Sequence, residues 1–392
     1  MLQYLFRSTI QPCFRYAQIG TQRLTGSVFP VSSPVYFLAY WRACRPGALL
    51  LVLLMLTGMP AYSASYAFPG NLPASCSGGD GSYTCDTLTL ADGDSLSIAV
   101  PTTIIVNGDS AVGANSRIND GGAASDLILQ VMGTTDTGKN STITANLAGA
   151  GVVTLGSTVK FIGNIKTQSA AINVGDFSTV LGSLKTVVAG VVNMGANNYL
   201  TGDVSTLSGA INVGANSRID GSISSALAGV VTLGAGVTVG GNITTASGAI
   251  NVGAGSNVTG FVMDTIAGAV TLGDNATVRG GIGSNAGAIT LGTGSSATGT
   301  VCSGRSGAIT LHDNALIGGN LKTKEGAITV GNMSTVNGTV SADDGAVTIS
   351  SSAKIGAVSS KILCPLDRLE MLARGAGTPV IKSREWRQIF MR

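Results

Sequence analysis

A short pattern of alternating apolar and polar residues recurs along residues 151–350. Each copy opens with Gly or Ala, and a stretch such as INVG or ITLG follows. Successive copies start 19 or 20 residues apart, at residues 151, 170, 190, 209, 229, 248, 268, 287, 307, 326 and 345. A period of this length is typical of a solenoid, in which every repeat packs against its neighbours.

Within a copy, positions are counted from its first residue as position 0. Positions 2, 4, 10 and 14 are apolar, as in Ile211, Val213, Val239 and Ile243. Gly occupies position 5 in nine copies and position 12 in ten. Because side chains alternate between the two faces of a strand, this pattern predicts two short strands per copy. We expect the Gly residues at corners that need a positive φ or close backbone approach.

A unit of this size cannot bury its apolar face alone, but stacked units bury a continuous column of Ile, Val and Leu. The sequence therefore predicts an all-β fold, a parallel β-helix (solenoid) of about eleven 19/20-residue rungs. Irregular leading rungs precede them, because TLTLADGDSLSI, TIIVNG and DLILQVMG also alternate, or run apolar, between turn residues.

Composition and charge divide the chain into four segments. We expect a presequence and signal peptide in residues 1–65, a disulfide-stapled cap with irregular rungs in 66–150, regular β-helix repeats in 151–361 and a basic tail in 362–392. Residues 1–67 and 351–392 each carry a net charge of +5, whereas residues 68–350 carry −7. An acidic body without a basic patch argues against nucleic-acid binding.

The apolar run Gly47–Met59 follows Arg42 and Arg45 and precedes the small-residue stretch AYSASYA. This order is typical of a secretory signal, and the run falls short of the roughly 20 residues that span a bilayer. It predicts export, with cleavage between Ser63 and Ala67 and membrane contact only during export. An over-long gene model, an extended n-region and a transit peptide stay open as explanations of the first 41 residues.

Cysteine positions agree with export. Cys76 and Cys85 bracket the short loop SGGDGSYT, where a disulfide would order a segment too small to fold alone. A metal site is the weaker alternative, because two further ligands at suitable spacing are absent. Cys302 and Cys364 have no evident partners in the sequence.

Few residues offer catalytic chemistry. His312 is the only histidine, so neither a His-based triad with a spare ligand nor a His metal cluster is expected. Asp203 and Asp220 lie on adjacent rungs and are the nearest candidates for paired carboxylates, but no aromatic platform accompanies them. We therefore expect no catalytic site, no metal and no cofactor, and the protein is predicted not to be an enzyme.

Position 3 is always Thr or Asn and is expected to point outward, so stacked rungs would form one polar ladder. Either the ladder is a flat hydrogen-bonding face for a glycan, ice or another partner, or it stabilises the stack and tolerates solvent. Its members are Thr154, Asn173, Asn193, Asn212, Thr232, Asn251, Thr271, Thr290, Thr310, Thr329 and Thr348.

The repeat resembles two families. Stretches such as GAINVGANSRIDGSI and GVVTLGAGVTVGGNI are similar to the rungs of bactofilins, which are polymer-forming β-helical cytoskeletal proteins of bacteria. The signal, the FPGNLPASCSGGDGSYTC opening and the rungs together resemble more closely the amino-terminal part of the mannose-sensitive haemagglutinin pilus-biogenesis protein Q group. The resemblance covers about residues 68–361 and implies no catalytic residues. Together with the export signal, it implies the periplasm or cell surface of a bacterium.

Two functions are therefore expected. The first is an exported, non-enzymatic structural protein that self-associates end to end or supports a cell-surface or pilus structure, with other copies or envelope components as partners. The second is a surface binding module that uses the Thr/Asn ladder. They differ in whether function lies at the ends of the column or on its flank.

Overall fold

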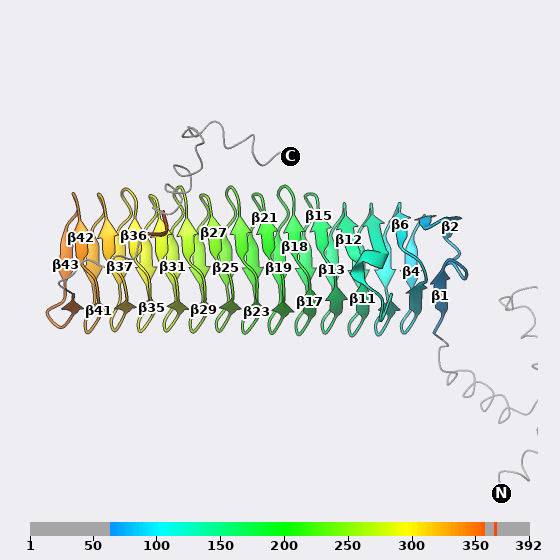
Figure 1. The fold of residues 1–392 in the computed structure, drawn as a ribbon, viewed down its shortest axis with the longest axis horizontal. Coiled ribbons are helices and arrows are strands. Elements are labelled where there is room, and N and C mark those ends of the chain that lie inside the picture. Colours follow the sequence, from blue (N-terminus) through cyan, green and yellow to red (C-terminus); the bar gives the residue numbers. More distant parts are fainter. Residues whose placement is uncertain (1–62, 357–363, 367–392) are drawn as a thin grey trace, which may run out of the picture. The chain divides into compact units, whose positions relative to one another are not determined.

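The computed structural model describes residues 63–356 and 364–366. They form a parallel β-solenoid in which each turn of the chain adds one strand to each of three sheets (Figure 1). The predicted fold class is confirmed. One 3-10 turn, η3 (Ala124–Asp126), interrupts the leading turns.

Sheet 1 has 15 strands and stacks in the order β1 (Ser65–Phe68), β5 (Ser95–Ile98), β8 (Arg117–Ile118), β11 (Thr142–Thr144), β14 (Lys160–Ile162), β17 (Thr179–Leu181), β20 (Tyr199–Leu200), β23 (Arg218–Ile219), β26 (Thr238–Val239), β29 (Asn257–Val258), β32 (Thr277–Val278), β35 (Ser296–Ala297), β38 (Leu316–Ile317), β41 (Thr335–Val336) and β44 (Lys354–Ile355).

Sheet 2 has 14 strands, in the order β4 (Leu88–Leu90), β7 (Ser110–Val112), β10 (Thr135–Thr137), β13 (Val153–Leu155), β16 (Ile172–Val174), β19 (Val192–Met194), β22 (Ile211–Val213), β25 (Val231–Leu233), β28 (Ile250–Val252), β31 (Val270–Leu272), β34 (Ile289–Leu291), β37 (Ile309–Leu311), β40 (Ile328–Val330) and β43 (Val347–Ile349).

Sheet 3 has 15 strands, in the order β2 (Cys76–Gly79), β3 (Ser82–Cys85), β6 (Thr102–Val106), β9 (Leu127–Val131), β12 (Asn146–Gly149), β15 (Ile165–Thr167), β18 (Leu184–Thr186), β21 (Val204–Thr206), β24 (Ile223–Ser225), β27 (Ile243–Thr245), β30 (Val262–Asp264), β33 (Ile282–Ser284), β36 (Val301–Ser303), β39 (Leu321–Thr323) and β42 (Val340–Ala342). Among these described strands, only β2 and β3 pair antiparallel.

The interior is filled as the alternation predicts. In the rung that starts at residue 248, positions 2, 4, 10 and 14 are Ile250, Val252, Val258 and Val262, and none is more than 2% exposed. The expected number of strands is wrong, because each regular rung contributes three strands rather than two. Positions 10 and 14 lie in different sheets, since the chain turns at the Gly of position 12 between them.

The repeated Gly residues allow the backbones of neighbouring rungs to approach closely, and most of them have ordinary torsion angles. A Cβ placed on Gly175 or Gly214 would come closer than 3.0 Å to the backbone of the preceding rung. Among the Gly residues at positions 5 and 12, only Gly163 has a positive φ, so the expected positive φ is wrong at the others. The left-handed residue is instead at position 7, where Asn often stands because it tolerates that conformation, as in Asn197 and Asn216.

The alternation between 19 and 20 residues has a structural location. Four residues connect β15 to β16, whereas five connect β18 to β19, and the same alternation continues through β36 and β37. The additional residue therefore lies in the turn from sheet 3 to sheet 2. Position 8 follows the same two-rung period, with Ser in every second rung, as in Ser178, Ser217 and Ser256.

Residues 66–150 continue the three sheets, through β1 to β12. Most of the predicted presequence and most of the basic tail lie outside the described residues. Within residues 63–356 and 364–366, no helix is long and apolar enough to cross a bilayer.

Candidate binding surface

The eleven Thr and Asn residues at position 3 form one straight row on the outer face of sheet 2. Each is the middle residue of its strand, and each is paired in register with the next, from Thr154 opposite Asn173 to Thr329 opposite Thr348. Adjacent members are therefore about one strand spacing, roughly 4.8 Å, apart. We call this row the ladder.

The ladder has two chemically different halves. Toward the N-terminal end, Asn193 donates from Nδ2 to Oδ1 of Asn173 at 2.9 Å, and Asn212 donates in the same way to Asn193 at 2.9 Å. Toward the C-terminal end, five consecutive members from Thr271 to Thr348 are Thr. The Asn half uses its side chains within the stack, whereas the Thr half presents a regular column of hydroxyl and methyl groups.

The positions on either side of the ladder are small and uncharged. Position 1 is Ala or Val in all eleven rungs, and position 5 is Gly except for the exposed His312 and for Ser350. None of the residues at positions 1, 3 and 5 is Lys, Arg, Asp or Glu. The resulting face is flat and neutral, so it suits a regular uncharged surface better than an ionic ligand.

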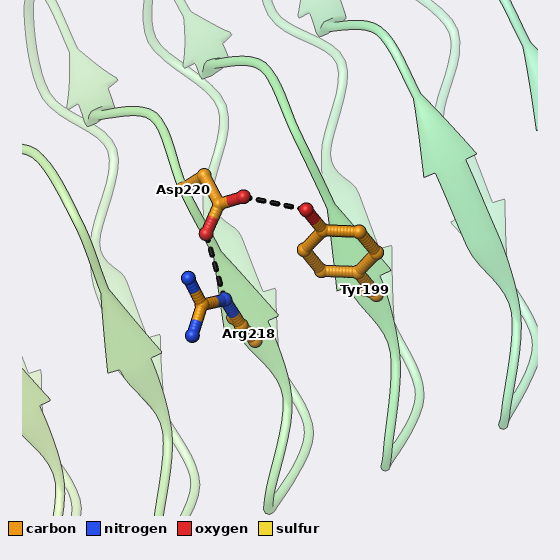
Figure 2. Close-up of polar contacts among 3 residues, drawn as sticks. All are labelled: Tyr199, Arg218 and Asp220. Atoms are coloured by element: carbon orange, nitrogen blue, oxygen red, sulfur yellow. Dashed lines mark hydrogen bonds and ion pairs between the residues drawn. The ribbon is translucent and has the colours of Figure 1, made fainter.

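The two candidate carboxylates take part in structural hydrogen bonds. Asp220 accepts from the Tyr199 hydroxyl at 2.6 Å and from Nε of Arg218 at 2.7 Å, on the outer face of sheet 1 (Figure 2). The hydrogen bond from Tyr199, assisted by Arg218, lowers the pKa of Asp220, and the same bond raises the pKa of Tyr199. Asp203 accepts from the backbone N–H of Ser222 at 2.7 Å.

A second polar column lies inside the solenoid and was not anticipated. Position 16, at the inner end of the third strand, is buried and polar in nine consecutive rungs: Thr167, Thr186, Thr206, Ser225, Thr245, Asp264, Ser284, Ser303 and Thr323. Most of these side chains bond to the backbone of the turn that follows, as Thr245 does to the carbonyl of Gly248 at 2.6 Å. The signal was present in the sequence as a Ser/Thr column two residues after position 14.

Asp264 is the single carboxyl group in this inner column. It accepts from the backbone N–H of Gly268 at 2.6 Å, from that of Ile266 at 3.1 Å and from the Thr245 hydroxyl at 2.9 Å. Burial raises the pKa of Asp264, and these hydrogen bonds offset part of the increase. Because these hydrogen bonds join Asp264 to the turn that follows it and to the preceding rung, its role in the inner column is structural.

The two ends of the column differ. At the N-terminal end, Cys76 and Cys85 form the predicted disulfide, which closes the antiparallel pair β2–β3. Phe68 and Tyr83 pack edge to face there, with ring centroids 4.8 Å apart, and are 0% and 2% exposed. At the other end, Val347 and Ile349 of the last rung are 42% and 41% exposed.

Comparison with other proteins adds no assignment: no protein-family model, no curated protein and no solved structure matches the chain. Within the described part of the chain, no three His, Cys, Asp or Glu side chains cluster closely enough to hold a metal ion. The features of the described residues that bear on function are the ladder, the exposed C-terminal end at Val347 and Ile349, and the cysteines.

Proposed function

We propose that the protein is an exported, non-enzymatic structural solenoid that self-associates through its C-terminal end. The observation that carries this proposal is the difference between the two ends of the column. The resemblance to bactofilins and to the pilus-biogenesis Q group supports a structural role at the cell envelope.

The C-terminal end has the properties of an association surface. β42, β43 and β44 are the last strands of sheets 3, 2 and 1, so one edge of each has no further described strand beside it. Val347 and Ile349 occupy interior positions, and their counterparts one rung earlier, Ile328 and Val330, are 0% and 2% exposed. Unpaired strand edges beside exposed apolar side chains favour pairing with another chain.

The N-terminal end does not offer a matching surface. Leu88 and Leu90 of β4, the first strand of sheet 2, are 1% and 2% exposed, so the inner face is covered at this end. A column with one open and one closed end associates through the open ends of two copies. We therefore expect dimers with the two C-terminal ends in contact rather than long filaments.

Export is part of the proposal. The disulfide between Cys76 and Cys85 supports an oxidising compartment. β1 begins at Ser65 and pairs with β5 over four residues, so cleavage before Ser65 would leave this strand whole. Within the predicted window from Ser63 to Ala67, the cut is thus expected near its start.

Sedimentation velocity and negative-stain imaging of the exported, signal-cleaved protein test this proposal. We expect rods that double in length as concentration rises, and monomers for the variant Val347→Lys/Ile349→Lys. The variant Thr271→Lys/Thr290→Lys adds the same charge on the flank and should still dimerise. Strictly monomeric wild type, or dimers that persist in the Val347→Lys/Ile349→Lys variant, would overturn the proposal.

The ladder supports a second candidate function, a surface binding module for a glycan or for ice. The observation that favours it is the neutral face beside five stacked Thr residues. Binding to insoluble polysaccharides and inhibition of ice recrystallisation are the assays. The Thr271→Lys/Thr290→Lys variant should lose either activity while Val347→Lys/Ile349→Lys keeps it, and the absence of both activities in the wild type would exclude this function.

A further inference from the structure

Two cysteines that are far apart in the sequence meet on the outer face of sheet 3. Cys302 is the middle residue of β36, and it forms a disulfide with Cys364, which is 62 residues later. Cys302 and Cys364 are 3% and 8% exposed, and Pro365 is also buried. Figure 1 places this short segment, red in the colour scale, beside β36. Residues 364–366 therefore pack on the flank of the column, three rungs before its end.

The rungs beneath this segment depart from the repeat. Position 15 faces outward, and it is Lys, Ser or Thr in most rungs, as in Lys185, Ser224 and Lys322. In three consecutive rungs it is Met263, Gly283 and Cys302. Met263 is 3% exposed although it points away from the interior, so the outer face of sheet 3 is covered at this rung.

The two glycines of the middle rung make room for the segment. A Cβ on Gly281 would lie 2.8 Å from Cγ of Pro365, and a Cβ on Gly283 would lie 3.3 Å from Cγ of Leu366. The middle rung is the only one of the eleven with Gly at both outward positions of the third strand. The shape of the face thus matches this particular segment.

The same rungs interrupt a hydrogen-bonded column. At position 13, a side-chain oxygen usually accepts from the backbone N–H of the next rung, as in Asn164 to Ser183 at 2.9 Å and Asp203 to Ser222 at 2.7 Å. The column runs as far as Asn242, which accepts from Phe261 at 3.0 Å. Phe261 and Gly281 have no side-chain oxygen, and the column resumes with Thr300, which accepts from the backbone N–H of Asn320 at 3.3 Å. At Phe261 and Gly281, a surface for packing therefore takes the place of the hydrogen bonds that position 13 makes in other rungs.

We propose that Phe261, Met263, Gly281, Gly283 and Cys302 form a docking site for the chain's own Cys364–Pro365–Leu366 segment, and that the disulfide makes it a redox-sensitive latch.

The latch is closed by a protein or small-molecule disulfide. One of the two cysteine thiolates attacks the external disulfide, forms a mixed disulfide and releases one external thiol. The thiolate of the other cysteine then attacks the mixed disulfide, forms the Cys302–Cys364 bond and releases the second external thiol. Two electrons and two protons pass to the external disulfide, and an external dithiol reverses the exchange. This latch stands independently of the proposed association through the C-terminal end.

The variant Gly283→Lys is designed to block docking of the Cys364–Pro365–Leu366 segment without disturbing the fold of the solenoid. The three atoms nearest to a Cβ at this residue are side-chain atoms of Leu366, Cys302 and Pro365, at 3.3, 3.7 and 3.7 Å, so no backbone atom is among them. Lys already stands at the same position as Lys166, Lys185 and Lys322. Thr244→Lys makes the same change two rungs away and is the matched control.

The test is carried out on the full exported chain in glutathione buffers of graded ratio, with thiol alkylation and peptide mass spectrometry to quantify the Cys302–Cys364 bond. For Gly283→Lys we expect the equilibrium constant for closure to fall about tenfold or more, because the segment loses its site and with it effective concentration. Thr244→Lys should match the wild type. Equal constants for all three proteins would overturn the docking site.

Hydrogen exchange tests the latch. In the wild type, reduction should expose the peptide that contains Phe261 and Met263 to faster exchange, and reoxidation should restore its protection. The Cys302→Ser/Cys364→Ser variant should exchange like the reduced wild type. Protection that persists after reduction would overturn the latch.

Discussion

Asp264 provides the most direct test of how the inner column stabilises the fold. Eight of the nine members of that column are Thr or Ser, and Asp264 lies between Thr245 and Ser284. The variant Asp264→Thr therefore replaces the one carboxyl group with the side chain of its neighbour. It keeps a hydroxyl oxygen that can accept from the backbone N–H of Gly268, as Thr323 does from Gly326 at 3.2 Å.

The sign of the pH effect follows from the raised pKa of Asp264. The folded state holds this proton more tightly than the unfolded chain, so its contribution to stability is complete below the ordinary pKa of Asp, about 3.9. That contribution is lost as the pH rises through the pKa of the folded state. The free energy of unfolding falls over this range by at most about 1.4 kcal/mol per pH unit, because one proton is released. Asp264→Thr removes this loss.

Urea denaturation followed by circular dichroism across that pH range measures the effect. We expect the free energy of unfolding of Asp264→Thr, relative to the wild type, to increase with pH and then to become constant. Asp203→Ser is the control, because it removes an exposed carboxylate and introduces the residue found at Ser183 and Ser222. A difference between Asp264→Thr and the wild type that stays constant with pH would refute the reasoning.

Three further predictions follow from single contacts. Tyr199→Phe removes the hydrogen bond that lowers the pKa of Asp220, so a carboxyl NMR titration should give a higher pKa for Asp220, and an unchanged value would contradict this account. Asn193→Ala removes two amide hydrogen bonds from the ladder, so thermal denaturation should show a loss of about 1–3 kcal/mol, while Thr329→Ala in the same row should cost less. Cys76→Ala/Cys85→Ala opens a small loop, so urea denaturation should show a loss of about 3 kcal/mol, and a variant as stable as the wild type would argue against the disulfide's role.

The interior of the column could be predicted because the information is local. A side chain two residues along a strand points the same way, so Ile211 and Val213 define an inner face without knowledge of the rest of the chain. The fixed interval between copies then implies that equivalent residues stack. This is why the ladder members lie in one row, as in Thr271 beside Thr290.

The third strand could not be separated from the second in this way. Only three residues separate Val239 from Ile243, and apolar residues at that spacing read as one segment. The bend between them depends on how closely the rungs approach at Gly241, which is a property of the stack. The prediction of two strands per rung therefore missed the bend between the second and third strands, but it assigned the inward-facing residues correctly.

The flank site was beyond sequence reasoning for a different reason. Cys364 lies after the end of the period, so the repeat does not say which rung it meets. The signal lay in the rungs themselves, where Phe261, Gly281 and the position-15 residues Met263, Gly283 and Cys302 replace the polar residues that most other rungs carry at positions 13 and 15. Such departures are informative only after the repeat has shown which side chains face outward.

The alternation of four- and five-residue turns between sheets 3 and 2 bears on how such a chain changes in length. Two rungs, or 39 residues, are the shortest segment whose duplication reproduces both the turn lengths and the Ser alternation at position 8. Copying that segment adds two strands to every sheet and lengthens the column by roughly 9.6 Å, with every existing contact repeated. The identical stretches GAINVG at 209 and at 248 are spaced by this unit, so the sequence repeats itself at the interval that the turn lengths require.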